Sequence, residues 1–226
     1  GRGLVLALAG AGCHLLLHYN RSSQEAEATA AEARALGVRV ELQSADLSEP
    51  SESEAVINAA VASLGPAQVL LNSAAIFPGD TLEDVSVEAW NETLRINLTG
   101  PVFLTQAFAR ALPEGLDAAV VNITDWRTAR PYPGHFSYTV AKGGLDAFTR
   151  AAAVALAPRI RVNAVALGAI LPPAGRDSAY LKELARELPL RRIGSVDLIA
   201  EAVLHVLRND FMTGEIMRVD GGAHLV

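Results

Sequence analysis

Short apolar runs alternate along the chain with longer segments rich in Ala, Leu, Glu and Arg. The longer segments repeat their apolar residues at helical spacing, whereas the short runs are β-branched or continuously apolar, as buried strands are. This alternation is typical of repeated βα units and predicts an α/β fold in which helices cover both faces of a parallel sheet. With no internal repeat and no linker, a single domain spanning residues 1–226 is expected.

The predicted helices are Arg2–Ala11, Ser22–Leu36, Ser51–Leu64, Ser86–Leu112, Phe136–Ala157, Arg176–Leu188 and Ser195–Leu207. The predicted strands are His14–Tyr19, Val38–Gln43, Gln68–Leu71, Ala118–Thr124, Arg161–Ala166 and Glu215–Val219.

Composition narrows the class of function. Half of the 226 residues are hydrophobic, yet no run approaches the roughly 18 apolar residues of a membrane span. No signal peptide opens the sequence, so we expect a cytoplasmic protein without a membrane partner. Cys13 is the only cysteine and the five histidines are scattered, so neither a disulfide nor a metal site is expected. A net charge of -6 argues against nucleic acid as the main partner.

Polar, small or turn-forming residues follow most of the predicted strands. In open α/β sheets, ligands bind beyond the carboxyl ends of the strands, so the chemistry is expected among these residues. In chain order they are Asn20-Arg21-Ser22, Asp46-Leu47, Asn72-Ser73-Ala74-Ala75, Asp125 and Leu167-Gly168.

Tyr138 and Lys142 lie four residues apart on a predicted helix, and Asp125 precedes the tyrosine by 13 positions. A free tyrosine, with a pKa of about 10, is a poor acid near neutrality. A cation one turn away favours the phenolate and would tune the proton for transfer to a substrate during reduction. Taken alone, the tyrosine and lysine are also compatible with an amphipathic helix that carries ordinary surface residues.

Together with the Val219-Asp220-Gly221-Gly222 terminus, these motifs resemble the short-chain dehydrogenase/reductase family over essentially the whole chain. The family's N-N-A-G motif is found as Asn72-Ser73-Ala74-Ala75, its helical asparagine as Asn97, and its P-G motif as Leu167-Gly168. The resemblance implies a Rossmann-type doubly wound sheet and an oxidoreductase that uses a nicotinamide cofactor. It also implies a homotetramer, in which the helices over 86–112 and 136–157 pair across a two-fold axis.

The family's first strand and most of its glycine-rich loop, T-G-x-x-x-G-x-G, have no counterpart here. Aligning Arg2 through Gly12 with the family's first helix makes Gly1 the last glycine of that loop, which would face the cofactor pyrophosphate. In the family's strand order, 3-2-1-4-5-6-7, the missing strand is central, so two edges of unpaired backbone groups would face each other. We therefore expect this not to be the complete natural chain. Without the resemblance, Gly1-Arg2-Gly3 is a flexible terminus.

Asp125 stands where most members of the family have a serine that hydrogen-bonds the substrate carbonyl. Pteridine reductases within the family carry an aspartate there, in a segment similar to Asn122-Ile123-Thr124-Asp125, and a phenylalanine over the pterin at the position of Phe77. Trp126 is a further candidate for the substrate pocket, and Tyr132 and His135 are weaker ones. The alternatives are a loop or capping aspartate, a phenylalanine that closes the core, and a tryptophan that is only a wall.

Asn97 lies four residues before Pro101, which cannot give the Asn97 carbonyl its helical hydrogen bond. In the family this asparagine helps relay protons through a water to the catalytic lysine, which matches Lys142. That lysine also binds the nicotinamide ribose and lowers the tyrosine pKa. A simple kink in the helix is the alternative.

The segment His18-Tyr19-Asn20-Arg21-Ser22 contains no acidic residue for a ribose 2′-hydroxyl. Arg21 offers a planar fork for a 2′-phosphate, so NADPH is favoured over NADH. Ser22 could equally be the N-cap of the next helix, and Asp46 a turn residue. The resemblance implies that Gly1, Asn20, Arg21, Ser22, Asp46, Leu47, Asn72, Ala74, Tyr138, Lys142 and Gly168 bind the cofactor.

The leading hypothesis is an NADPH-dependent reductase of a pterin or similar heterocycle, with proton delivery by Tyr138 and Asp125. The alternatives are a carbonyl or quinone reductase and a dinucleotide-binding regulatory protein without catalysis. The sequence does not separate pterin, folate and quinone substrates, because the turn-rich segment 171–180, a predicted lid with Pro172-Pro173, is irregular.

Overall fold

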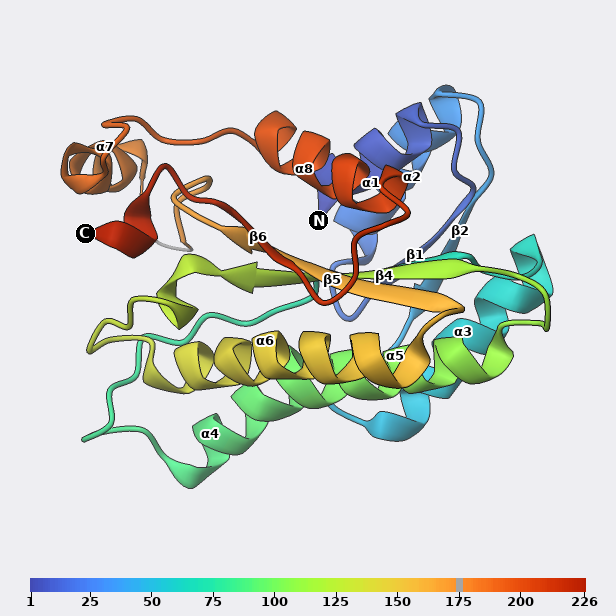
Figure 1. Cartoon of the computed structure of the whole chain (residues 1–226), viewed down its shortest axis with the longest axis horizontal. Helices are drawn as coiled ribbons and strands as arrows, with labels where there is room; N and C mark the ends of the chain where they lie inside the picture. Colours follow the sequence, from blue (N-terminus) through green and yellow to red (C-terminus); the bar gives the residue numbers. More distant parts are fainter. Residues whose placement is uncertain (174–176) are drawn as a thin grey trace.

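The computed structural model of the chain (Figure 1) describes residues 1–173 and 177–226. Its strands are β1 (Leu15–Tyr19), β2 (Val40–Ser44), β3 (Val69–Asn72), β4 (Ala118–Asp125), β5 (Ile160–Leu167) and β6 (Ile216–Val219). Its α-helices are α1 (Arg2–Gly10), α2 (Ser23–Ala35), α3 (Pro50–Leu64), α4 (Val87–Leu94), α5 (Gly100–Ala111), α6 (Phe136–Leu156), α7 (Ser178–Glu187) and α8 (Val196–Arg208). The predicted elements are all present, and strand β2 shows one of the largest boundary differences, starting at Val40 rather than Val38. Residues 174–176, which belong to the predicted lid and to the start of the predicted helix 176–188, lie outside the described residues.

The strands form two parallel sheets, with the orders β1-β2 and β3-β4-β5-β6. The order within each sheet is the predicted one. A cavity of about 590 Å³ is lined by residues of both β1 and β3 and separates the two sheets. Leu15 and Leu17 line it from one sheet and Val69 and Leu71 from the other. Among the described residues, no strand pairing joins the two sheets.

Helices cover both faces of the sheet layer (Figure 1): α4, α5 and α6 lie on one side, and α1, α2 and α8 on the other. Strand β4 is buried along its whole length, including the polar Asn122 and Thr124, as expected for a strand covered on both faces. Successive side chains alternate between the two faces. Val120 accordingly packs into the core that includes Phe108 of α5, whereas Val121 packs into the core that includes Val203 of α8.

The predicted helix 86–112 is interrupted in the structure, which corrects that prediction. Residues Arg95–Thr99 form one turn of π-helix between α4 and α5, and the Gly100 N–H donates to the Arg95 carbonyl five residues back. Pro101 has no N–H with which to continue the normal pattern, and the wide turn accommodates its absence. Gly100 also lies against Leu47, since a Cβ at this glycine would be 2.9 Å from the Leu47 carbonyl oxygen.

Candidate active site

Asp125 and Tyr138 meet at the carboxyl end of the larger sheet. Asp125 is the last residue of β4, and Tyr138 lies in the first turn of α6. The Tyr138 hydroxyl donates to Asp125 Oδ2 at 3.0 Å, and both residues are buried, each 8% exposed. The sequence placed these two residues in one site, and the structure joins them by a direct hydrogen bond.

Lys142 lies one turn further along α6, on the same side of the helix. Its Nζ donates to the Ile123 carbonyl at 2.8 Å and lies 5.8 Å from the centre of the Tyr138 ring. Burial lowers the pKa of Lys142 to about 8, although the carboxylates of Asp125 and Asp146 oppose the shift. The ammonium group is therefore held beside the phenol by the backbone of β4.

The pKa of Tyr138 differs from the expectation. The sequence predicted a lowered pKa because of the nearby lysine. In the structure, burial raises the pKa of the phenol well above its usual value, and the Asp125 carboxylate raises it further. A phenolate would be desolvated and would face a negative carboxylate. Tyr138 is therefore a protonated donor throughout the neutral range.

Arg127 completes the charge arrangement and was not identified from the sequence. Its backbone N–H donates to Asp125 Oδ1 at 2.9 Å, and its Nη1 lies 3.3 Å from the same oxygen. Both side chains are largely buried, so water screens this ion pair weakly. Arg127 lowers the pKa of Tyr138, opposing the effects of burial and Asp125. The signal that could have revealed it is an arginine two residues after a strand-terminal aspartate.

Asn97 holds the loop that carries Phe77. Its Oδ1 accepts from the Ile76 N–H, and its Nδ2 donates to the Ile76 carbonyl, each at 2.9 Å. The side chain is fully buried, and the π-turn between α4 and α5 carries it. Its amide thus positions the residue next to Phe77. The predicted role in a water relay involves its backbone carbonyl and stays a prediction.

The ring of Phe77 is enclosed by other side chains. His135 stacks on it with ring centres 3.7 Å apart and an interplanar angle of 14°. Tyr138 meets it edge-on at 4.6 Å, and the guanidinium of Arg127 lies 5.3 Å from its centre. Phe77 therefore lies next to Tyr138, and its predicted contact with a substrate ring stays a prediction. A substrate ring that stacks on the face covered by His135 must displace the imidazole.

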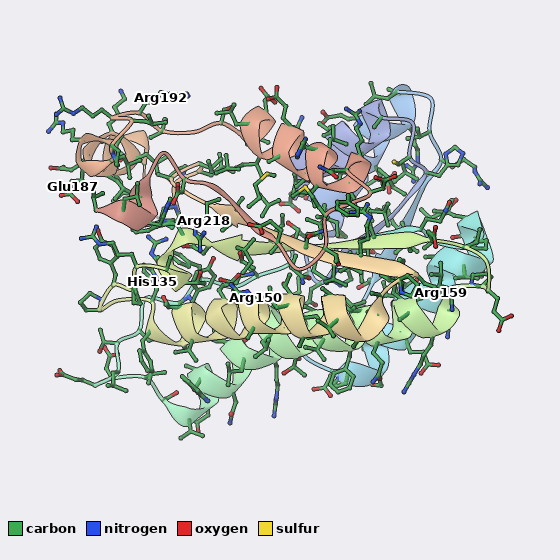
Figure 2. The ribbon with its side chains drawn as sticks, in the orientation of Figure 1. His135, Arg150, Arg159, Glu187, Arg192 and Arg218 are labelled. Carbon is green, nitrogen blue, oxygen red and sulfur yellow. The ribbon has the colours of Figure 1, made fainter. Side chains whose placement is uncertain are left out.

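Trp126 differs from the prediction, because it is only 2% exposed and packs in a cluster with Leu181 and Leu188. Its ring also meets Tyr132 edge-on at 5.5 Å. The structure thus places Trp126 as an inner wall that supports helix α7 and Arg127. Figure 2 shows His135 where the chain enters α6, and because its ring stacks on Phe77, this residue lies within the candidate site.

The predicted 2′-phosphate site lies after β1. Asn20, Arg21 and Ser22 are exposed between β1 and α2, and Ser22 makes no side-chain capping hydrogen bond. Asp46, at the end of the neighbouring β2, has a lowered pKa because its carboxylate accepts from Ser48, with a smaller effect of the Arg21 charge. The ends of β1 and β2 thus bring the exposed Asn20, Arg21 and Ser22 and the half-buried Asp46 to one edge.

The other predicted cofactor residues divide into two groups. Gly1, Leu47, Ala74 and Asn72 all line the cavity between β1 and β3. Gly168 lies instead against the C-terminal segment, where a Cβ would be 2.4 Å from the Cα of Asp220.

Asn72 serves mainly to connect strands. Its Nδ2 donates to Asn122 Oδ1 at 2.8 Å, while its buried Oδ1 has no protein partner. Its amide side chain is therefore engaged within the core, and its assignment to cofactor binding stays a prediction.

The described residues contain neither a metal-binding cluster nor a membrane-spanning helix. In the part of the chain that the structure describes, no cluster of three His, Cys, Asp or Glu side chains could hold a metal ion. Across residues 1–173 and 177–226, no helix has the length and apolarity that crossing a bilayer requires.

Comparison with known proteins gives consistent matches over the whole chain. Residues 1–224 match the family described as enoyl-(acyl carrier protein) reductase. A ketoacyl reductase assigned to the granaticin polyketide synthase of Streptomyces violaceoruber is 35% identical, with 100% of this chain and 92% of the relative covered. The 3-oxoacyl-[acyl-carrier-protein] reductase FabG of Staphylococcus epidermidis is 30% identical, with 100% and 94% covered.

A solved structure is also similar over the full length of this chain. The crystal structure of FolM alternative dihydrofolate reductase 1 from Brucella canis, in complex with NADP, superposes with a TM-score of 0.93 at 35% identity. The alignment covers 100% of this chain and 90% of that one.

Proposed function

Because the chain belongs to the short-chain dehydrogenase/reductase family, we propose that this oxidoreductase reduces a pterin or a related flat heterocycle with NADPH. The observation that carries the proposal is the Asp125 carboxylate, which accepts the Tyr138 hydroxyl at 3.0 Å. A carboxylate accepts hydrogen bonds, so it suits a ring that presents N–H groups better than it suits a carbonyl oxygen. The FolM enzyme of Brucella canis supports the same substrate class, being named an alternative dihydrofolate reductase.

The residues around the strand ends fit NADPH. Arg21 and Ser22 are exposed, and the acidic group that senses the Arg21 charge, Asp46, does so only weakly, so both residues can receive a 2′-phosphate. Gly1 is the N-cap of α1, whose first N–H groups lack helical partners and favour an anion. When bound, NADPH supplies the hydride.

The protein's own groups would then handle the proton. Tyr138 stays protonated because its pKa is raised, and it donates the proton to the substrate. Arg127 offsets the negative charge that appears on the phenolate beside Asp125. The Lys142 ammonium, 5.8 Å from the centre of the Tyr138 ring, would add to this effect. Asp125 orients the phenol before transfer and binds the N–H groups of the heterocycle.

The second candidate is a reductase of carbonyl substrates, and the ketoacyl reductases among the relatives favour it. It keeps the roles of Tyr138 and Lys142 and makes Asp125 a structural residue. A regulatory protein without catalysis is disfavoured, because the tyrosine, lysine and asparagine are all held in an ordered arrangement.

NADPH oxidation by the protein should be measured with dihydrobiopterin, dihydrofolate, quinones and simple ketones. Turnover of a pterin or folate, well above that of the ketones, supports the proposal. Efficient reduction of ketones alone would establish the carbonyl reductase. No oxidation with any substrate would favour the regulatory protein.

The cofactor preference rests on Arg21. We expect Arg21→Asp to raise the KM for NADPH by at least about tenfold, because a carboxylate would repel the 2′-phosphate. The KM for NADH should change less, since a carboxylate can accept from a ribose hydroxyl. Steady-state kinetics with both cofactors measures the ratio. Arg39→Asp is the matched control, because Arg39 precedes β2 at the opposite end of the sheet. An unchanged ratio in the Arg21 variant would refute the assignment.

The pH dependence follows from Lys142. Its pKa of about 8 means that it is a cation below this pH and becomes neutral above it. We therefore expect kcat/KM to fall as the pH rises through about 8, because the neutral amine no longer stabilises the phenolate. In Lys142→Arg the guanidinium stays charged, so the fall should move to higher pH even if the rate is lower. A wild-type profile that stays level to about pH 9.5 would contradict this role.

The homotetramer and the cytoplasmic location stay predictions. Val140 and Val154 are exposed apolar side chains of α6, 41% and 83% exposed, and would meet a second copy in the proposed pairing of helices.

A further inference from the structure

Asp80 joins the loop after β3 to the start of α6. Its Oδ1 accepts from the Ser137 N–H at 3.0 Å, and its Oδ2 accepts a short hydrogen bond from the Ser137 hydroxyl. Its carbonyl accepts from the Phe136 N–H at 3.1 Å. Three hydrogen bonds thus connect one loop residue with two residues that follow about 57 positions later in the chain.

These contacts cap the N-terminus of α6, which its own N-cap residue does not do. His135 occupies the N-cap position with φ 59°, in the left-handed region, and makes no side-chain capping bond. The first N–H groups of a helix need acceptors, and a negative charge is favourable at this end. Asp80 provides both the acceptors and the negative charge. It does so at Phe136 and Ser137, the two residues that directly precede Tyr138. The placement of Tyr138 therefore depends on an acceptor from another segment.

The same loop is fixed at its other end. Asn97 holds Ile76 by two hydrogen bonds of 2.9 Å, and His135 donates from Nδ1 to the Pro78 carbonyl at 2.6 Å, since a carbonyl can only accept. Phe77 lies between these anchors, edge-on against Tyr138. The anchored loop thus sets the wall and the proton donor of the site relative to each other.

The contact between Asp80 and Ser137 is buried on the side of Ser137. Ser137 is 0% exposed, and its hydroxyl lies 3.2 Å from the hydroxyl of Thr93, which is also buried on α4. Water therefore cannot easily replace the Asp80 carboxylate as the partner of Ser137.

We propose that Asp80 is a positioning residue: it caps α6 from the loop after β3 and so holds the Tyr138 hydroxyl in place for proton donation. The inference rests on the proposed function only in taking Tyr138 as the proton donor. It applies to a pterin and to a carbonyl substrate alike.

Asp84 provides a matched control. It belongs to the same loop region, is exposed, and accepts from the Thr81 N–H and hydroxyl at 2.6 and 2.9 Å. It therefore caps its own turn, as Asp80 caps α6, but its hydrogen bonds remain local. Replacing it tests the effect of loosening the loop alone.

The experiment compares Asp80→Ala, Asp80→Asn and Asp84→Ala, using the substrate that the wild type reduces best. We expect Asp80→Ala to lower kcat at least about tenfold while the KM for NADPH changes less than about twofold. Asp80→Asn should recover at least about threefold, because an amide oxygen can still accept from the Ser137 N–H. Asp84→Ala should stay within about twofold of the wild type.

Amide hydrogen exchange gives a readout that needs no substrate. In Asp80→Ala, exchange at residues 136–138 should become at least about tenfold faster while the middle of α6 is unchanged. If Asp80→Ala does not fold, Ser137→Ala removes one of the bonds and should show the same pattern to a smaller degree.

Three results would overturn the inference. The first is a kcat of Asp80→Ala within about twofold of the wild type, and the second is an equal loss in Asp84→Ala. The third is faster exchange throughout α6, which indicates general destabilisation. If the wild type reduces no substrate, the proposed function fails, and the exchange measurement alone then decides whether Asp80 holds the start of α6.

Discussion

Replacement of Tyr138 by phenylalanine is expected to lower kcat by at least about a hundredfold, the effect of losing a positioned acid. The hydroxyl is the group that the structure holds at 3.0 Å from Asp125, and its raised pKa keeps it protonated near neutrality. Phenylalanine removes the proton but retains the ring that lies edge-on against Phe77. The measurement is steady-state NADPH oxidation with saturating substrate.

The affinity for NADPH separates catalysis from binding in this variant. Because the substitution deletes little surface, the dissociation constant measured by NADPH fluorescence should change less than about threefold. A variant that keeps at least a third of the wild-type kcat would show that Tyr138 is not the donor.

Asp125→Ser is expected to reduce pterin turnover by at least about tenfold, or about 1.4 kcal/mol of transition-state stabilisation. Serine can donate to a carbonyl oxygen but cannot bind two N–H groups as a carboxylate does. The change also removes the carboxylate that pairs with Arg127 at 3.3 Å. Reduction of simple carbonyls should survive or improve, so kcat/KM for both substrate types is measured in parallel.

Asp125→Asn is the informative control, because it keeps the size of the side chain and removes its charge. If the charge matters, this variant should also lose pterin turnover. If the wild type reduced ketones efficiently but no pterin or folate, the pterin assignment would have to be abandoned, whatever the serine variant did.

Much of the fold could be predicted because its signals are local. Alternating apolar runs and helical segments identify the strands and helices, and their ends in the structure lie close to the predicted ones. Strand ends of a parallel sheet meet at one edge, which is why Asp125 could be assigned to the site. Lys142 was assigned to the same site because its spacing from Tyr138 resembles the family's motif. The interruption at Arg95–Thr99 was missed, although Pro101 indicated a kink at this place.

The rest of the site depends on contacts between distant segments. Nothing near Asp80 in the sequence indicates that it caps a helix that begins at Phe136. The pKa of Tyr138 was predicted in the wrong direction, because the neighbouring lysine is visible in the helix pattern and burial beside Asp125 is not. Trp126 adjoins Asp125 in the chain, yet its ring turns into the core.

The stacked pair of His135 and Phe77 has a consequence for affinity. An imidazole 3.7 Å from the phenylalanine already makes the contact that a flat ligand would make on that face. Binding there is an exchange of one stacked ring for another, so the gain is the difference between two stacking energies, each about 0.5 to 1.5 kcal/mol. A ligand must also break the hydrogen bond from His135 to the Pro78 carbonyl. A variant with a smaller side chain at position 135 should therefore bind flat ligands more tightly than the wild type does, even though the substitution removes an aromatic residue from the site.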